Sequence, residues 1–249
     1  SEILLNIKGY RKMRDTLNLG FFVPIVYDYS ADDVAPYIVL EYCGPDFQCL
    51  LEAGACSVSV TEPLLETLRK VFRSSCTVGP DGPESIQELI SMIDKLVDEF
   101  VVPHFALSKV IMGRFRSLPK GFRNLPHKWT FASWDFTPNN LCKLKDIKFI
   151  DPRGDKITGN PIPGLACYAG ILRDVHRFRN ADVAYDMVYH FATGELAEVL
   201  KMERELAKKC FLLGRLFQSL MSVSFRVAKS CSQAEPFLIA AKEYLAQIA

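Results

Sequence analysis

The scarcity of strand-forming sequence most constrains what this chain can fold into. Strand-like runs occur as two pairs, residues 23–29 with 37–42 and residues 141–144 with 147–150. The first pair is rich in Val, Ile and Tyr and is separated by a polar stretch, whereas only Lys145 and Asp146 separate the second. Short polar connections between β-prone runs are typical of hairpins. We therefore predict a small β element made of hairpins.

Most of the remaining sequence carries apolar residues at the three-to-four spacing of a helix. We expect helices at 1–19, 61–74, 84–101, 104–116, 165–178, 181–192, 196–229 and 233–248. The turn cluster 79–83 and the Pro- and Gly-punctuated stretches 117–140 and 152–164 separate them. This order predicts an α+β fold with a small β part and a large helical part.

Composition excludes few function classes. The chain has 249 residues, 49% of them hydrophobic, with 30 Lys+Arg against 29 Asp+Glu. Such a chain can bury a core, and its near-zero net charge provides no overall field for nucleic acid or an anionic membrane. The longest apolar stretch, 211–227, contains Arg215 and Gln218 and predicts a buried helix instead of a membrane span. We expect no membrane association.

The eight cysteines form no C-x-x-C pair, and no His lies at the spacing of a zinc ligand. We therefore expect reduced, mostly buried thiols in a cytoplasmic protein. The four His are scattered, and we expect structural roles for them. The chain contains no G-x-S-x-G, H-E-x-x-H, Walker or Rossmann motif, which disfavours hydrolase, zinc-protease and dehydrogenase functions.

One constellation carries recognisable chemistry. Asp135 is followed five residues later by Asn140, and after a further eleven residues Asp151 ends a short apolar strand. Phosphoryl transfer of the kinase type uses these residue types at about this spacing: the first Asp accepts the proton of the attacking hydroxyl, and the Asn and second Asp hold Mg²⁺. The alternative is that all three residues are turn formers around Pro138 and Pro152.

The segment 131–151 resembles the catalytic core of the aminoglycoside phosphotransferase and choline kinase group of the protein-kinase-like superfamily. That group carries an H-G-D-x-x-x-x-N loop and a following I-D, which match Asp135, Asn140 and Asp151 here. The resemblance implies a kinase-like fold and the use of ATP and Mg²⁺, with Asp135 as the base and Asn140 and Asp151 as metal ligands. The form D-P-R-G at 151–154 is similar to bacterial members that act on sugars.

The first strand pair resembles the fourth and fifth strands and the adenine-binding hinge of the same group. By that resemblance, the backbone of Glu41, Tyr42 and Cys43 would contact a purine. It also implies two lobes: a small, incomplete N-terminal lobe at 1–43 and a helical C-terminal lobe at 44–249.

Three departures from the group's pattern accompany the resemblance. Ser133-Trp134 replaces the His-Gly before the catalytic Asp, and Gly164 replaces a later Asp that braces the loop. A Gly-rich loop and a strand Lys are expected before the first helix, and neither is found in this sequence. If Glu2 is the carboxylate that pairs with that Lys, the strand lies ahead of the sequence; Glu2 is alternatively a solvent-exposed helix residue.

A basic stretch leads into the candidate loop, because no acidic residue occurs between Glu99 and Asp135. It could attract phosphates or an anionic acceptor, or it could be a solvated helix face. Its aromatic residues follow no known nucleic-acid-binding pattern, so we do not expect nucleic acid as a partner.

Two functional hypotheses follow. The first is an ATP-dependent phosphotransferase that moves the γ-phosphoryl group to a hydroxyl of a small molecule or sugar. The second is a catalytically degenerate kinase-fold protein that binds a protein partner. The sequence does not identify the acceptor.

Overall fold

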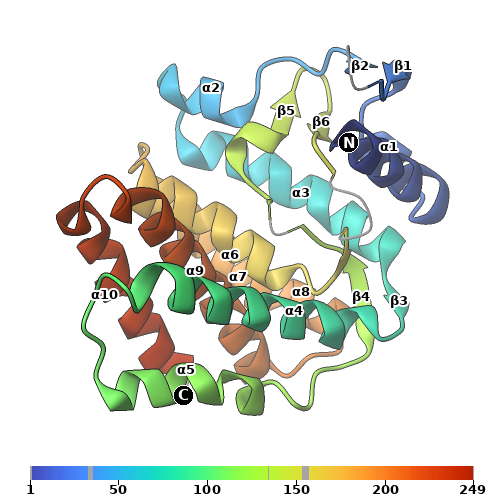
Figure 1. The fold of residues 1–249 in the computed structure, drawn as a ribbon. Coiled ribbons are helices and arrows are strands. Elements are labelled where there is room, and N and C mark those ends of the chain that lie inside the picture. The colour runs from blue at the N-terminus through green and yellow to red at the C-terminus, as the bar shows by residue number, and fades with distance from the viewer. Residues whose placement is uncertain (1, 33–35, 134, 153–156, 249) are drawn as a thin grey trace.

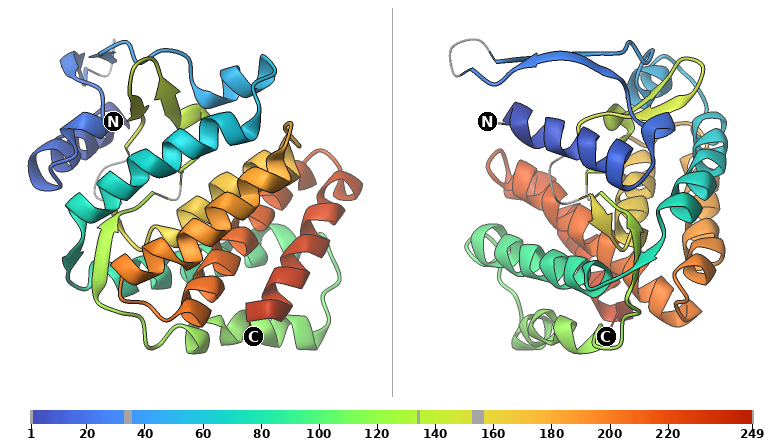
Figure 2. Two further views of the ribbon diagram at one scale, coloured as in Figure 1. Left: turned by 180° about the vertical axis from the view of Figure 1, so that it is seen from behind. Right: turned by 90° about the vertical axis from the view of Figure 1, so that its right-hand side faces the viewer.

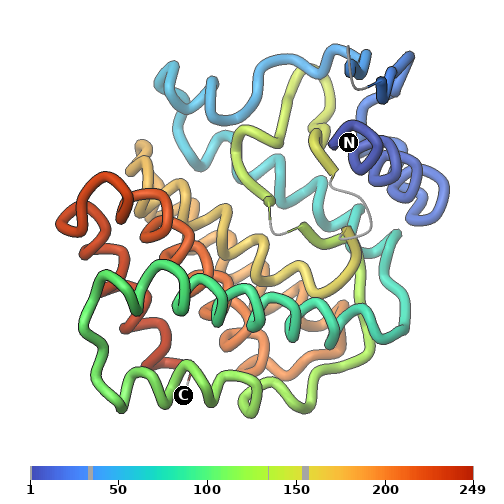
Figure 3. The backbone as a smooth tube through the Cα atoms, in the orientation of Figure 1, coloured from blue at the N-terminus to red at the C-terminus, as the bar shows by residue number. Residues whose placement is uncertain are grey.

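The computed structural model describes residues 2–32, 36–133, 135–152 and 157–248. Helices form most of it, and the β structure of the described residues is confined to short antiparallel pairings (Figure 1). The predicted α+β class is thus correct. One end of the molecule holds α1 and the two hairpins, and the other holds the long C-terminal helices (Figure 3).

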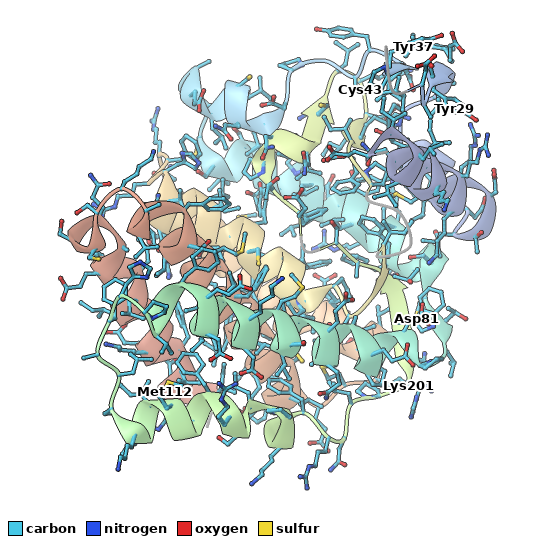
Figure 4. All side chains as sticks on the ribbon, in the orientation of Figure 1. Tyr29, Tyr37, Cys43, Asp81, Met112 and Lys201 are labelled. Carbon is cyan, nitrogen blue, oxygen red and sulfur yellow. The ribbon has the colours of Figure 1, made fainter. Side chains whose placement is uncertain are left out.

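The N-terminal end begins with α1 (Glu2–Arg11), which continues as a π-helical turn, Lys12–Thr16. A 3₁₀ turn, Gly20–Phe22, leads into the predicted hairpin of β1 (Val26–Ser30) and β2 (Tyr37–Leu40), in which Ser30 pairs with Tyr37. Tyr29 and Tyr37 lie together on this hairpin at the edge of the molecule (Figure 4). The second predicted hairpin is β5 (Leu141–Lys143) with β6 (Ile147–Phe149).

A short sheet joins sequence-distant segments in the middle of the molecule. Its order is β3–β4–β7, formed by Thr77–Val78, Lys128–Phe131 and Thr158–Gly159. Strand β3 lies between the helix predicted at 61–74 and the turn predicted at 79–83, and β4 and β7 lie inside two stretches predicted to be irregular. They are very short, and their partners are tens of residues away, so no local alternation indicates them.

The helical part contains α2 (Phe47–Glu52), α3 (Ser57–Ser75), α4 (Asp81–Leu96) with a π-helical turn (Val97–Val101), α5 (Lys109–Gly121), α6 (Ile162–Gly170) with a π-helical turn (Ile171–Val175), α7 (Ala181–Thr193), α8 (Glu195–Val199), α9 (Arg204–Val227) and α10 (Cys231–Ile248). The helix expected at 104–116 begins later because Ser108 caps it, its Oγ accepting from Ile111 N at 3.3 Å. The helix expected at 196–229 is two helices, α8 and α9.

Helix α9 lies at the centre of the helical part, with α6 on one side and α10 on another (Figure 2). Its buried face includes Phe211, Leu216 and Leu220, which are fully buried. The stretch 211–227 is therefore the buried helix that the sequence predicts, and Arg215 is buried within it. None of the helices in the described parts of the chain combines the length and apolar character that crossing a bilayer requires.

Four buried phenylalanines join the N-terminal end to the middle of the molecule. Phe22, Phe131, Phe136 and Phe149 pack with neighbouring ring centroids 5.4–6.5 Å apart. Burying each such ring contributes about 1.5–3 kcal/mol. Because Phe136 directly follows Asp135, this cluster fixes the position of the loop that carries the candidate base.

All eight cysteines are free thiols, as predicted. Cys43, Cys142, Cys167 and Cys210 are buried, whereas Cys49 and Cys231 are exposed. The expectation of mostly buried thiols therefore holds for half of them.

Candidate active site

The loop between β4 and β5 carries Asp135 and Asn140, and a hydrogen bond from the Asn140 side chain links these two residues. Asn140 Nδ2 donates to the Asp135 backbone oxygen at 3.0 Å, and Asn140 N donates to the Thr137 oxygen at 3.0 Å. Asn140 Oδ1 accepts from Asn139 Nδ2 at 3.4 Å, and because a carbonyl oxygen has two lone pairs, it can still offer one of them to a cation. Asn140 is 5% exposed, so its orientation is fixed. Trp134 lies outside the described residues.

The hairpin of β5 and β6 returns the chain to this loop and so brings Asp151 beside Asn140. Leu141 pairs with Phe149, and Ile150 N donates to the Asn140 backbone oxygen at 2.9 Å. Asp151 is the next residue, and its φ of 59° is in the left-handed region. Such a conformation is uncommon for a residue other than Gly and often occurs at functional sites.

Helix α1 holds the backbone at Asp151. Asp151 N donates to Tyr10 Oη at 3.2 Å, and Tyr10 is buried. A Cβ at Gly9 would lie 2.0 Å from the Pro152 oxygen, so only Gly lets α1 approach this closely. Burial raises the pKa of Tyr10, and the charges of Asp151, Cys43 and Cys142 act in the same direction. The Tyr10 phenol therefore lies where the predicted hinge meets the predicted metal ligand.

The donor set around Asn140 and Asp151 fits Mg²⁺. Magnesium in phosphoryl-transfer sites usually takes one or two protein oxygens and completes its shell with phosphate and water. An amide oxygen and a carboxylate, brought together by the β5–β6 hairpin, are of that kind. No cluster of three or more His, Cys, Asp or Glu side chains suited to a metal occurs among the described residues, so an all-protein metal cage is not found there.

The predicted hinge follows β2 and contacts β6. Glu41 N donates to the Ile25 oxygen at 2.8 Å, and Glu41 Oε2 lies 3.9 Å from Lys148 Nζ. Tyr42 is 76% exposed, whereas Cys43 is buried and its Sγ donates to the Glu41 oxygen at 3.2 Å. Burial raises the pKa of Cys43. Because the Glu41 amide is engaged within the hairpin, a purine would have to use the other backbone groups of this segment.

The two sequence departures beside the loop contact each other. A Cβ built on Gly164 would lie 2.1 Å from the Ser133 backbone oxygen. A carboxylate at position 164 is therefore excluded by this loop conformation, and the loop rests directly on the start of α6. A Cβ on Gly214 of α9 would likewise lie 2.3 Å from the Pro163 oxygen. Two glycines thus let α6 fit tightly between the loop and α9.

A pocket of about 410 Å³ opens beside Asp135. The loop contributes Asp135, Thr137 and Asn139, and the other walls come from α2, α6, the π-helical turn Ile171–Val175 with the adjoining His176, and α9. Thr137 Oγ1 is buried and has no hydrogen-bond partner among the described residues. Burial raises the pKa of Cys167, on the pocket wall, to about 12; the positive charge of Arg215 lowers it and the negative charge of Asp135 raises it.

The basic stretch before the loop is a helix face away from it. Arg116 pairs with Asp98 at 2.7 Å and with Asp94 at 3.5 Å, which joins α5 to the end of α4. Helix α5 lies at the opposite end of the molecule from β5 and β6 (Figure 1). These ion pairs favour the solvated-face interpretation of the basic stretch.

Comparison with known proteins identifies the fold. No family model matches the chain, and no curated protein matches it. It is similar to the structure of a "putative aminoglycoside phosphotransferase" from Ralstonia eutropha JMP134, with a TM-score of 0.56 and 10% identity over 98% of this chain and 82% of that one. It is also similar to a choline/ethanolamine kinase family protein from Mesorhizobium loti, with a TM-score of 0.54 and 14% identity over 100% of this chain and 84% of that one.

The chain has a protein-kinase-like fold. The predicted fold is thereby confirmed, and the roles of individual residues remain predictions. Within this kinase-like fold, Asn140 is hydrogen-bonded to the Asp135 backbone and to Ile150, the residue before Asp151. Glu2 begins α1, and Arg153 lies outside the described residues.

Sequence reasoning missed Tyr10, Gly9, Lys148 and the pocket. The contacts of Tyr10 with Asp151 and of Lys148 with Val23 span more than 100 residues of sequence. The Gly at position 9 inside an amphipathic helix was the one available signal, because such a Gly often marks a close approach of backbones.

Proposed function

We propose that this protein is an ATP-dependent phosphotransferase that moves the γ-phosphoryl group to a hydroxyl of a small molecule. One observation carries the proposal: a single loop has Asp135 on the wall of a 410 Å³ pocket, and the Asn140 backbone at its end is hydrogen-bonded to Ile150, the residue before Asp151. A phosphotransferase needs this division, with the acceptor on one side of the base and the nucleotide phosphates on the other.

In the proposed reaction, Asp135 orients the acceptor hydroxyl and takes its proton as the oxygen attacks the γ-phosphorus, while the bond from that phosphorus to the β–γ bridging oxygen breaks and ADP leaves. Asn140 Oδ1 and the Asp151 carboxylate would hold Mg²⁺, which neutralises charge on the phosphates when bound. The hydrogen bond from Asn140 Nδ2 to the Asp135 oxygen couples the metal side to the base side. The hydrogen bond from Asp151 N to Tyr10 Oη holds the backbone from which the Asp151 side chain extends.

The nucleotide base would lie against the segment Glu41, Tyr42 and Cys43. This assignment makes residues 1–43 a small N-terminal lobe and residues 44–249 the catalytic lobe. Support comes from contacts of this region with the β5–β6 hairpin: Glu41 Oε2 lies 3.9 Å from Lys148 Nζ, and Lys143 N donates to the Pro45 oxygen at 3.1 Å. Lys148 Nζ also donates to the Val23 oxygen at 3.3 Å, which joins β6 to the residues before β1.

The proposal is tested by ATP binding and by transfer. We expect ATP with Mg²⁺ to raise the melting temperature, with about 2.7 kcal/mol of stabilisation at one hundred times the dissociation constant. Asp151→Asn should remove the Mg²⁺ dependence, and Asp135→Asn should abolish ADP formation in the presence of an accepted alcohol while preserving ATP binding. Asp146→Asn, in the exposed turn between β5 and β6, is the matched control.

Two results would overturn the proposal. One is the absence of a thermal shift at millimolar ATP with Mg²⁺, which would instead support the partner-binding hypothesis. The other is an unchanged rate of ADP formation in Asp135→Asn.

A further inference from the structure

The pocket beside Asp135 has two chemically different rows on one helix. Helix α9 contributes an apolar row at a spacing of four residues, Phe217, Met221 and Phe225, and next to it a polar row, Gln218, Ser222 and Arg226. Ile171 and Val175 of the π-helical turn line it as well. Residues four apart lie on the same helix face, so each row lines the pocket continuously.

The charge of the pocket is not suited to a cation. Asp135 is the one carboxylate among the described residues that line it, and His176 and Arg226 are its basic groups. Asp174 lies behind this wall but is bound to Arg215 and, at 2.7 Å, to Arg173. An ammonium group entering the pocket would lose hydration without gaining a carboxylate partner other than the base itself.

Hydrogen bonds from Arg215 to Gln218 and from Gln218 to Ser222 fix which atoms of the polar row donate and which accept. Arg215 Nη1 donates to Gln218 Oε1 at 2.8 Å, and Gln218 Nε2 donates to Ser222 Oγ at 3.0 Å. The guanidinium can only donate, so the orientation of the Gln218 amide is determined. Because Ser222 Oγ accepts here, its own hydrogen can be donated elsewhere, as can the second hydrogen of Gln218 Nε2. Both residues are 5% exposed, so the arrangement is built into the core.

We infer that the acceptor is a hydroxyl compound with an apolar body, no positive charge, and a carbonyl or carboxylate group that accepts hydrogen bonds from Gln218 and Ser222. This inference rests on the proposed function in one respect, namely that the bound hydroxyl faces Asp135 for transfer. The apolar row and the π-helical turn would enclose the body of the compound, and the donors of the polar row would set its orientation.

The charge preference is tested with three probes of one shape. They are para-substituted benzyl alcohols that carry an aminomethyl, a carboxamide or a carboxylate group. Binding to the wild-type protein is measured without nucleotide by ligand-observed NMR titration. We expect the carboxamide and carboxylate compounds to bind at least about tenfold more tightly than the aminomethyl compound, a difference of about 1.4 kcal/mol.

Two pairs of variants locate the binding. Ser222→Ala should weaken carboxamide binding about fivefold, as expected for one lost hydrogen bond. Ser224→Ala is its control, because Ser224 Oγ donates to the Met221 oxygen and does not line the pocket. Phe225→Glu should invert the preference toward the aminomethyl compound. Its control is Ile239→Glu on α10, because Ile239 is similarly exposed (50% against 68% for Phe225) but does not line the pocket. Ile239→Glu should leave the preference unchanged.

Equal or tighter binding of the aminomethyl compound overturns the inference, as does the absence of binding by the carboxamide and carboxylate compounds. Identical behaviour of the Ser222→Ala and Ser224→Ala variants also overturns it. Because no ATP is present, a failure of the proposed function leaves this result unaffected. Conversely, an unaltered transfer rate in Asp135→Asn with the charge preference intact would refute the proposed function alone.

Discussion

The backbone oxygen of Ser133 lies so close to Gly164 that a Cβ atom at position 164 would approach it to 2.1 Å. These are two of the positions at which this sequence departs from the pattern that it otherwise resembles. The two departures are therefore coupled, because the loop at Ser133 occupies the space that a side chain at 164 would need. The backbone of α6 supports the loop directly.

Substituting Gly164 tests this coupling. Gly164→Ala should destabilise the protein by about 1–3 kcal/mol, because neither backbone can move away without displacing Phe136 or α9. Gly113→Ala in α5 is the matched control: no atom lies within 4 Å of the added Cβ, and Gly to Ala inside a helix stabilises by about 0.5–1 kcal/mol. Urea unfolding of both variants measures the difference. A neutral Gly164→Ala would contradict the close contact.

Tyr10 is predicted to position Asp151. Tyr10→Phe removes the hydroxyl that accepts from the partly buried Asp151 N. The free energy of unfolding should fall by about 1–3 kcal/mol as a result. Because φ at Asp151 is 59°, the freed backbone should also relax, so Mg²⁺-dependent ATP binding should weaken beyond the loss of stability. Calorimetric titration with ATP, with and without Mg²⁺, separates the two effects.

The control for this substitution is Tyr37→Phe. The Tyr37 hydroxyl donates to Asp28 Oδ2 at 2.9 Å on the exposed hairpin. Removing this hydroxyl should therefore change neither stability nor Mg²⁺-dependent ATP binding appreciably. Equal effects of the two substitutions on Mg²⁺-dependent binding would remove the positioning role of Tyr10.

Local sequence patterns predicted much of the fold, and contacts between distant segments account for what they missed. The hairpin at 141–150 and the Asp135, Asn140 and Asp151 spacing are local, and the structure forms the hairpin as predicted. Strand β7 was missed because its pairing of Thr158 with Phe131 leaves no periodic signal in either segment. The apolar spacing continues across residues 200–203, so it conceals the break between α8 and α9.

The sequence predicts candidate ligands for the site, but it does not indicate which residues support them. Three motif residues within 17 positions of sequence identify the candidate chemistry. Tyr10 contacts Asp151 from α1 and Gly164 contacts the loop at Ser133 from α6, and a single sequence does not indicate which distant residues meet. The same holds for the pocket beside Asp135, which the loop and α9 line together.

Arg215 is predicted to be a major contributor to stability. It is fully buried, donates to Gln218 at 2.8 Å and Tyr244 at 3.1 Å, and is paired with Asp174. Arg215→Met should cost about 3–5 kcal/mol because it leaves buried polar partners behind. Arg69→Met, which breaks an exposed pair with Glu195, should cost no more than about 1 kcal/mol. Comparable losses in chemical unfolding would contradict this assignment.

The thiols should differ in reactivity, and Cys56 should react first at neutral pH. Backbone amides at the start of α3, that of Val58 foremost, lower its pKa, and Asn180 Nδ2 donates to its Sγ at 3.3 Å. Cys49 is more exposed, but the hydrogen bond to Asp46 raises its pKa. Burial raises the pKa of Cys210 to about 12.

Because the thiolate is the reactive form, alkylation by iodoacetamide should begin at lower pH for Cys56 than for Cys49, despite the greater exposure of Cys49. Cys210 should stay unmodified until the protein unfolds.

Peptide mass spectrometry after timed labelling between about pH 6 and pH 9, a range that brackets the usual thiol pKa, measures the order in which the thiols react. Asn180→Leu should move the onset for Cys56 to higher pH by removing a donor to the thiolate, whereas Cys49 should be unaffected. Faster labelling of Cys49 than of Cys56 at neutral pH would show that exposure outweighs the effect of the backbone amides at the start of α3.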